Sequence, residues 1–227
     1  MSPKRKRTLF AAAVGLLAAW AIALAVVAVQ RSESTPATAG AGAPVVDVGS
    51  PEGPFRAGPL PQGLAGKPAY DFALTDARGE RVATRTLRGR PYVVTFLYTD
   101  CPDVCPLIAS ELDAALERLG PRGEEVEVIA VSADPKGDTR MKVLRWLEER
   151  ELPDNFRYTI GTEEQLRPVW DGFFAAPQDR DREESAHSAS IWLIDAKGGL
   201  RAKFSGGLPV PPADIAHDLG VLLEEAS

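Results

Sequence analysis

The sequence predicts an α/β domain of three layers with a mixed sheet, preceded by one transmembrane helix. Two observations predict the domain: short runs of β-branched and aromatic residues alternate with segments of helical spacing, and a hairpin pattern and a last helix close the chain. A third observation predicts the membrane helix. Leu9 to Val29 is apolar throughout and carries no charge, and about twenty such residues span a bilayer core.

The N-terminal segments predict a single-pass protein of the bacterial plasma membrane. Residues 1–30 comprise a basic tip and the membrane anchor. The tip contains four consecutive cations, Lys4 to Arg7, which are expected to keep it in the cytoplasm. Residues 31–62 are rich in Pro, Gly, Ala and Ser and are expected to form a flexible linker. The folded domain, residues 63–227, then lies on the outer face. A cleaved signal is the alternative, since "ATAGAGA" offers small residues for processing.

The first half of the domain is predicted to form a hairpin, two buried strands and the helix between them. Residues 70–84 alternate and contain an Arg78-Gly79 turn, which predicts the hairpin. Residues 90–98 form a dense β-branched and aromatic run, typical of a strand buried on both faces. Pro106 to Leu119 places apolar residues at helical spacing, and residues 125–133 are another buried strand.

The second half is predicted to continue the alternation. Asp138 or Thr139 can cap the next helix. The apolar residues that share one face of this helix are Met141, Leu144 and Leu147. Residues 155–160 are a short strand, and Thr162 with Gln165 matches a capping box that opens a helix to about Phe173. Residues 188–206 predict two strands around a Gly-Gly turn, and the last helix runs from about Pro212 to Glu225.

The charge pattern excludes one class of partner. The formal net charge is −6, although the N-terminal "SPKRKR" is basic, so the domain itself is more acidic than the total suggests. An acidic domain repels phosphate backbones, and this repulsion argues against nucleic-acid binding. The sequence also lacks a GxGxxG fingerprint or a Gly-rich phosphate loop.

The only two cysteines, Cys101 and Cys105, lie between a buried strand and a helix. Open α/β sheets place their sites beyond the carboxyl ends of strands. This placement and the element order together predict a thioredoxin-like fold. Pro102 fits the first helical position with Cys101 as the cap. The spacing of four then puts both cysteines on one helix face, with their Cα atoms about 6 Å apart. The amides of a helix N-terminus stabilise thiolate.

Three roles are open to this dithiol. A structural disulfide would close a loop so short that it stabilises the fold little. A redox pair and a metal site both make use of the helix-terminal thiolates. Inert burial of both cysteines would require a coincidence of position.

The histidines decide whether a metal site can be completed. His217 points away from the apolar face of the last helix and is expected to be a surface residue. His187 lies in the loop before a strongly apolar strand. In a thioredoxin-like domain this loop lies against the dithiol helix. Two thiolates and one imidazole suit Cu(I), and Cu(II) with added ligands. Zinc would need a fourth ligand, such as Asp103.

Four segments together resemble the Sco/SenC family of membrane-anchored copper proteins: "FLYTDCPDVCP", "VSADPKGDT", "GTEEQL" and "AHSASIWLIDAKGGL". The resemblance implies a thioredoxin-like fold and one copper ion bound through Cys101, Cys105 and His187. It also implies a role in assembling the dinuclear copper centre of cytochrome c oxidase, as copper donor or thiol reductant. The implied partners are the copper-accepting subunit of that oxidase and a thiol reductant or second copper chaperone.

The sequence departs from the family pattern at several positions near the motif. Leu97 stands where the family often has Gly, and Asp100 and Arg140 also differ from the usual residues. The residue directly before His187 is not acidic. None of these departures removes a ligand, but they bear on partner recognition and copper affinity.

The leading hypothesis is therefore a copper metallochaperone, with Asp103 and Asp134 near the site. The rival is a thiol–disulfide reductase, in which Cys101 attacks a partner disulfide and Cys105 resolves it. A thioredoxin-type enzyme would ordinarily show CxxC and has no need for His187. A peroxidase is the third hypothesis; it requires a Thr three residues before the reactive Cys, and Thr99 stands only two before.

Overall fold

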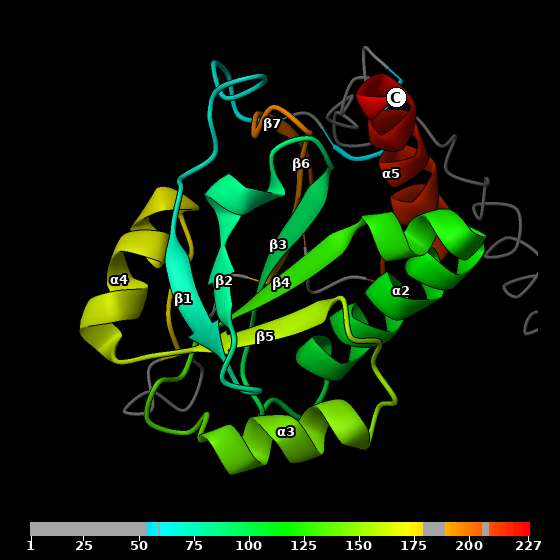
Figure 1. Ribbon diagram of the computed structural model, residues 1–227. Helices are drawn as coiled ribbons and strands as arrows, with labels where there is room; N and C mark the ends of the chain where they lie inside the picture. Colours follow the sequence, from blue (N-terminus) through cyan, green and yellow to red (C-terminus); the bar gives the residue numbers. More distant parts are fainter. Residues whose placement is uncertain (1–53, 59, 179–188, 206–208) are drawn as a thin grey trace, which may run out of the picture. The chain divides into compact units, whose positions relative to one another are not determined.

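The computed structural model describes residues 54–58, 60–178, 189–205 and 209–227 (Figure 1). All of them belong to Val48–Ser227, the second of two compact units into which the chain divides. The predicted membrane helix, most of the predicted linker and His187 lie outside the described residues. Within these ranges, no helix combines the length and the apolar character needed to cross a membrane.

Seven strands form one mixed sheet in the order β2-β1-β5-β4-β3-β6-β7. β3, β4 and β5 are parallel, and the remaining pairings are antiparallel. The strands are β1 Ala73–Asp76, β2 Arg81–Ala83, β3 Tyr92–Leu97, β4 Glu127–Ser132, β5 Phe156–Ile160, β6 Ser190–Ile194 and β7 Leu200–Ser205. The helices are α2 Val104–Arg118, α3 Arg140–Glu148, α4 Glu163–Gly172 and α5 Pro212–Ala226, with short 3₁₀ helices at Thr84–Leu87 and Gly120–Glu125.

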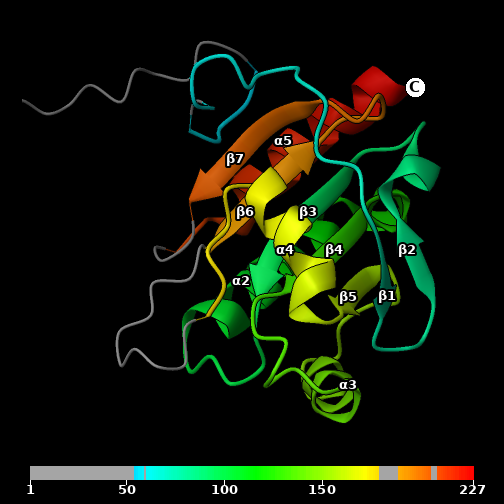
Figure 2. The same cartoon turned by 90° about the vertical axis from the view of Figure 1, so that its left-hand side faces the viewer.

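Helices cover both faces of the sheet, which confirms the predicted α/β class with a mixed sheet. α2, α3 and α5 contribute to the core on one face, and α4 packs on the other, the side turned toward the viewer in Figure 2. The central strand β3 serves both cores: Val93 and Leu97 point into the first, while Val94 and Phe96 point into the second. All six residues of β3 are buried, as its dense apolar run predicts.

Local signals predicted the start of α4 and one of the two offered caps of α3, but only part of the buried face of α3. The capping box of Thr162 and Gln165 is present. At α3 the cap is Thr139, and the buried face consists of Val143, Trp146 and Leu147. Of the predicted face, Leu147 is buried and Leu144 is half-buried, but Met141 is 70% exposed, so the prediction was wrong at Met141. At about 100° per residue, Met141 lies on the opposite side of the helix from the centre of that buried face.

Packing of the domain also includes residues 55–58, which the sequence places in the linker. Ala57 is buried, and Gly58 forms an isolated bridge with Lys203 of β7. The fully buried carboxylate of Asp218 on α5 accepts hydrogen bonds from the backbone N–H groups of Arg56, at 2.7 Å, and Ala57, at 2.9 Å. These contacts fix a segment whose composition alone gives no sign of order.

Asp218→Asn is expected to lower the free energy of unfolding by about 2 kcal/mol, because an amide N–H₂ would face one of the two backbone donors. Asp214→Asn is the matched control. Asp214 pairs with Arg56 at 2.8 Å in a partly exposed ion pair, and such pairs contribute about 1 kcal/mol or less. Urea unfolding of the two variants measures both effects, and equal losses would show that Asp218 does not hold the segment.

Candidate metal centre

The dithiol loop leaves the sheet where two parallel strands end. β3 ends at Leu97 and α2 begins at Val104, and the connection carries Cys101. The next strand along, β4, ends at the same edge, where the backbone N–H of Ala133 donates to the carbonyl of Leu97 at 2.8 Å. Carboxyl ends of adjacent parallel strands are where open α/β sheets place their sites.

The two sulfur-bearing residues are buried and adjacent. Cys101 is 5% exposed and Cys105 is fully buried, and both are in the reduced thiol form. The backbone N–H of Cys105 donates to the Sγ of Cys101 at 3.3 Å. An N–H of the first helical turn thus points at this sulfur, which favours its thiolate form.

The helix starts differently from the prediction. α2 begins at Val104, and its cap is Asp103, whose carboxylate accepts from the Val104 N–H. Cys101 therefore precedes the helix and is not its cap, and only Cys105 is helical. A carboxylate is the stronger acceptor for the free amides of the first turn, which explains why Asp103 takes this position. The Asp103 Oδ1 also lies 3.9 Å from the Cys101 Sγ.

The pKa values of Cys105 and Tyr98 at this site are raised. The hydrogen bond between the two thiol groups, followed by burial, raises the pKa of Cys105 far above its ordinary value. Burial, and next the charge of Cys101, raise the pKa of the Tyr98 hydroxyl as well. Cys105 therefore keeps its proton at neutral pH, and any cation that binds this sulfur must displace that proton.

Asp138 is the residue beside the dithiol loop whose role sequence reasoning missed. Its buried carboxylate accepts hydrogen bonds from the Thr99 N–H and Oγ1, both at 2.8 Å, from Ser132 Oγ at 2.6 Å and from the Tyr158 hydroxyl at 3.0 Å. It joins the dithiol loop to β4 and β5. Burial raises the pKa of Asp138, although these hydrogen bonds act in the opposite direction. The only sequence signal is its place in "DPKGDT", where it competes with Thr139 as a helix cap.

Two further acidic residues shape the surroundings. The Lys142 ammonium donates to both carboxylate oxygens of Asp100, each at 3.0 Å. This ion pair connects the residue before Cys101 to α3. Asp134, predicted near the site, is buried, and its Oδ1 accepts from the Gly137 N–H at 3.0 Å within the loop after β4.

The histidines have separate outcomes. His217 is exposed, as predicted, and its Nδ1 lies 2.9 Å from Asp218 Oδ1. His187 is outside the described residues. The described residues on either side of its segment are Gln178, whose N–H donates to Ala133 O at 2.8 Å, and Ala189, which packs against the core that contains both cysteines. The described part of the chain holds no group of three His, Cys, Asp or Glu side chains suited to a metal ion.

The donor set fits a soft cation. The sulfurs of Cys101 and Cys105 lie close together in the interior. The Cys101 sulfur accepts a hydrogen bond from a helix N–H, and the carboxylate of Asp103 lies beside it. Thiolates select Cu(I) and similar soft ions over Mg²⁺ or Ca²⁺. With two sulfurs alone the site is under-coordinated, so a third ligand has to come from elsewhere in the chain or from a partner.

Known proteins with this pattern are similar over most of the domain. The family model described as SCO1/SenC matches residues 63–224. An SCO2-like protein of Rickettsia felis is 30% identical over 134 residues, which cover 56% of this chain and 64% of that protein. The match thus spans less than two thirds of the relative's length.

Two solved structures are similar in fold. The copper-bound structure of Bradyrhizobium japonicum ScoI is 28% identical, with a TM-score of 0.59, and covers 69% of this chain and 100% of that one. The second structure is BsSco, described as a member of the Sco family of cytochrome c oxidase assembly proteins with a disulfide switch. It is 20% identical, has a TM-score of 0.62, and covers 73% of this chain and 98% of its own. The second likeness concerns the fold alone.

Proposed function

Because the chain belongs to the SCO1/SenC family, we propose that it is a copper metallochaperone for the dinuclear copper centre of cytochrome c oxidase. It binds one copper ion through Cys101, Cys105 and His187 and passes it to the copper-accepting subunit. Cu(I) is the favoured form, and Cu(II) binds with added ligands. Residues 1–30 anchor the protein in the bacterial plasma membrane, so that the domain works on the outer face.

The observation that carries this proposal is the contact between the two cysteines at the start of α2. The Cys105 N–H reaches the Cys101 sulfur at 3.3 Å, so one small cation can meet both sulfurs. Two peptide units join His187 to Ala189, which limits its Cα to about 7 Å from the Ala189 Cα. Ala189 packs against the core cluster to which both cysteines belong, and this position supports His187 as the third ligand.

Each residue has its own part in binding and release. Cys101, supported by the helix amide, is the sulfur that is ready to bind, whereas Cys105 must first lose its proton. His187 closes the site with a neutral imidazole nitrogen. A thiolate of the recipient then replaces one ligand at a time, so that the cargo is never released to water. The low ligand number makes this exchange feasible.

An anaerobic Cu(I) titration of the reduced full chain in detergent, against a competing chelator, tests the proposal. The wild type is expected to bind one equivalent, and His187→Ala to weaken binding about 100-fold, given that zinc sites gain about 10–16 kcal/mol from four ligands. His217→Ala is the matched control and should bind like the wild type. Binding that is indifferent to His187 would contradict the ligand set.

The raised pKa of Cys105 predicts a pH dependence. Because the proton on Cys105 competes with copper up to well above neutral pH, the apparent affinity should keep rising as pH increases from about 6 to about 8, by about tenfold per unit for each proton displaced. The His187 imidazole adds a second proton below its ordinary pKa of about 6.5. The same titration at three pH values measures the slope. A flat profile would exclude Cys105 as a ligand.

A second function is favoured by the same contact. Two buried thiols this close can form a disulfide, so the domain can also act as a thiol–disulfide reductase. The Cys101 thiolate attacks a partner disulfide, one partner sulfur leaves as thiolate, and a mixed disulfide forms. Cys105 then attacks Cys101, which releases the reduced partner and oxidises the dithiol. The partner gains the two electrons that the dithiol loses.

A further inference from the structure

We propose that Asp103 is the ligand that the site adds when it holds Cu(II), and that it remains the cap of α2 when the site holds Cu(I). The inference rests on the proposed function, in which two sulfurs and an imidazole bind Cu(I) and Cu(II) binds with added ligands. Asp103 thereby sets the relative affinity of the site for the two oxidation states.

The Asp103 carboxylate lies beside one of the two sulfurs. Its Oδ1 is 3.9 Å from the Cys101 Sγ. Metal–sulfur and metal–oxygen bonds are about 2.3 Å and about 2.1 Å long at zinc sites, so one metal ion can join a sulfur and an oxygen that are up to about 4.4 Å apart. A metal ion held by Cys101 is therefore within reach of the Asp103 carboxylate.

The same carboxylate caps α2. Its Oδ1 accepts the hydrogen bond of the Val104 N–H at the start of the helix. The described residues contain no ready group of three metal ligands, and Cys101, Cys105 and Asp103 are among them. The carboxylate therefore has to turn from Val104 toward the metal ion. Coordination competes with the cap, and only a metal ion that bonds well to oxygen displaces it.

The two oxidation states of copper differ in their affinity for oxygen. Cu(I) is a soft ion that prefers sulfur, whereas Cu(II) forms tetragonal sites with nitrogen and oxygen donors. Two thiolates also balance the charge of Cu(II) but exceed the charge of Cu(I), so a further anion is attracted more strongly by the Cu(II) form. Cu(II) therefore draws Asp103 from the helix, and Cu(I) leaves it there.

Exposure allows Asp103 to make this movement. Asp103 is at the surface, whereas Cys101 and Cys105 are buried. A surface carboxylate can turn without opening the core, and water can take its place on the Val104 N–H, as it does at many helix starts. The sulfurs are thus fixed ligands, and Asp103 is a ligand that joins and leaves.

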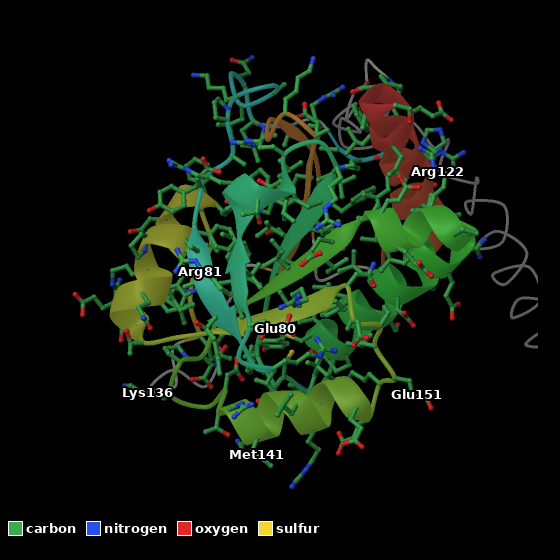
Figure 3. The ribbon with its side chains drawn as sticks, viewed as in Figure 1. Glu80, Arg81, Arg122, Lys136, Met141 and Glu151 are labelled. Carbon is green, nitrogen blue, oxygen red and sulfur yellow. The ribbon has the colours of Figure 1, made fainter. Side chains whose placement is uncertain are left out.

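Other donors of the described chain are less suited to this role. Both oxygens of Asp100 accept from the Lys142 ammonium at 3.0 Å, and Asp138 accepts four hydrogen bonds in the interior. The one further sulfur in the described ranges, that of Met141, belongs to a side chain that points away from the sheet in Figure 3. Asp103 combines exposure with a short distance to a cysteine sulfur.

The test compares Asp103→Asn, Asp103→Ala and Asp100→Asn with the wild type, as reduced full chains in detergent without oxygen. Asparagine caps a helix about as well as aspartate, so both Asp103 variants lose the carboxylate but only Asp103→Ala loses the cap. Asp100→Asn removes the same charge on the other side of Cys101. The probes are Cu(I) and Cu(II), each titrated against a competing chelator, and electron paramagnetic resonance reports on the ligands of Cu(II).

Both Asp103 variants are expected to weaken Cu(II) binding about tenfold or more, since even hydrogen-bond partners of metal ligands act on this scale. Cu(I) affinity should stay within about twofold of the wild type, so the reduction potential of the bound copper rises by about 59 mV for each tenfold loss. The Cu(II) resonance should change in both Asp103 variants and not in Asp100→Asn. In the copper-free chain, urea unfolding should show a loss of stability for Asp103→Ala but not for Asp103→Asn.

Two results would overturn the inference. If Asp103→Asn binds Cu(II) like the wild type while Asp103→Ala does not, Asp103 acts only as a helix cap. If Asp100→Asn weakens Cu(II) binding as much as Asp103→Asn does, charge alone explains the loss. Either result leaves Cu(I) binding by the wild type intact, so the proposed function stands. A wild type that binds no Cu(I) would contradict the proposed function itself.

Discussion

Cys105→Ser is expected to abolish tight copper binding and to leave the fold intact. The substitution removes one of the two sulfurs and replaces it with a hydroxyl, which is a poor ligand for Cu(I). If about 10–16 kcal/mol is shared among four ligands of a zinc site, one lost thiolate corresponds to a loss of more than about 100-fold in affinity. Cys101→Ser should have an effect at least as large, since its sulfur receives the helix amide.

The same variant separates the two candidate functions. A reductase that lacks its resolving cysteine still attacks through Cys101 and then remains joined to its partner, because nothing breaks the mixed disulfide. Cys105→Ser would then accumulate as a covalent adduct on non-reducing gels of membrane extracts. Strong copper binding by the wild type, lost in Cys105→Ser without an adduct, favours the carrier. An adduct together with unchanged copper binding would contradict the assigned roles.

Asp138→Ala is expected to cause the largest loss of stability of any substitution near the site, about 3 kcal/mol or more. The change leaves the Thr99 N–H and the hydroxyls of Ser132 and Tyr158 without their acceptor in a buried position. Because Thr99 is two residues before Cys101, the dithiol loop should loosen as well, and copper affinity should fall with stability.

Asp138→Asn is the matched variant and should cost much less. Its amide oxygen can still accept from Thr99, and the hydroxyls of Ser132 and Tyr158 can turn to accept from the amide nitrogen. Urea unfolding followed by tryptophan fluorescence measures both variants in the reduced chain. If Ala and Asn prove equally mild, Asp138 does not hold the dithiol loop to the sheet.

The sequence predicted the features that depend on neighbouring residues. The run from Tyr92 to Leu97 predicts a strand buried on both faces, and the spacing of Thr162 and Gln165 predicts the start of α4. Both signals are contained within six residues or fewer. The position of the two cysteines was predicted in the same way, since a strand pattern before them and a helical pattern after them are both local signals.

The misassigned features depend on choices between neighbours or on distant partners. Cys101 and Asp103 can each precede a helix that contains Pro near its start, and the stronger acceptor decides between them. Asp138 and Thr139 are both capable caps, and only the distant partners Thr99 and Tyr158 draw Asp138 into the interior. Likewise, no local pattern indicates that Asp218 holds residues 56 and 57.

The contacts of Asp218 with Arg56 and Ala57 have a consequence for the local concentration of the dithiol at the membrane. With the proposed anchor and a linker as flexible as its composition predicts, the chain between Gln30 and the domain would be about 24 residues when this segment is held and about 32 when it is released. The root-mean-square reach changes only from about 27 Å to about 31 Å. Since effective concentration falls roughly as the −3/2 power of chain length, holding the segment raises it about 1.5-fold for a nearby acceptor. Under the proposed anchoring, Asp218 would therefore raise how often the dithiol meets an acceptor fixed in the same membrane.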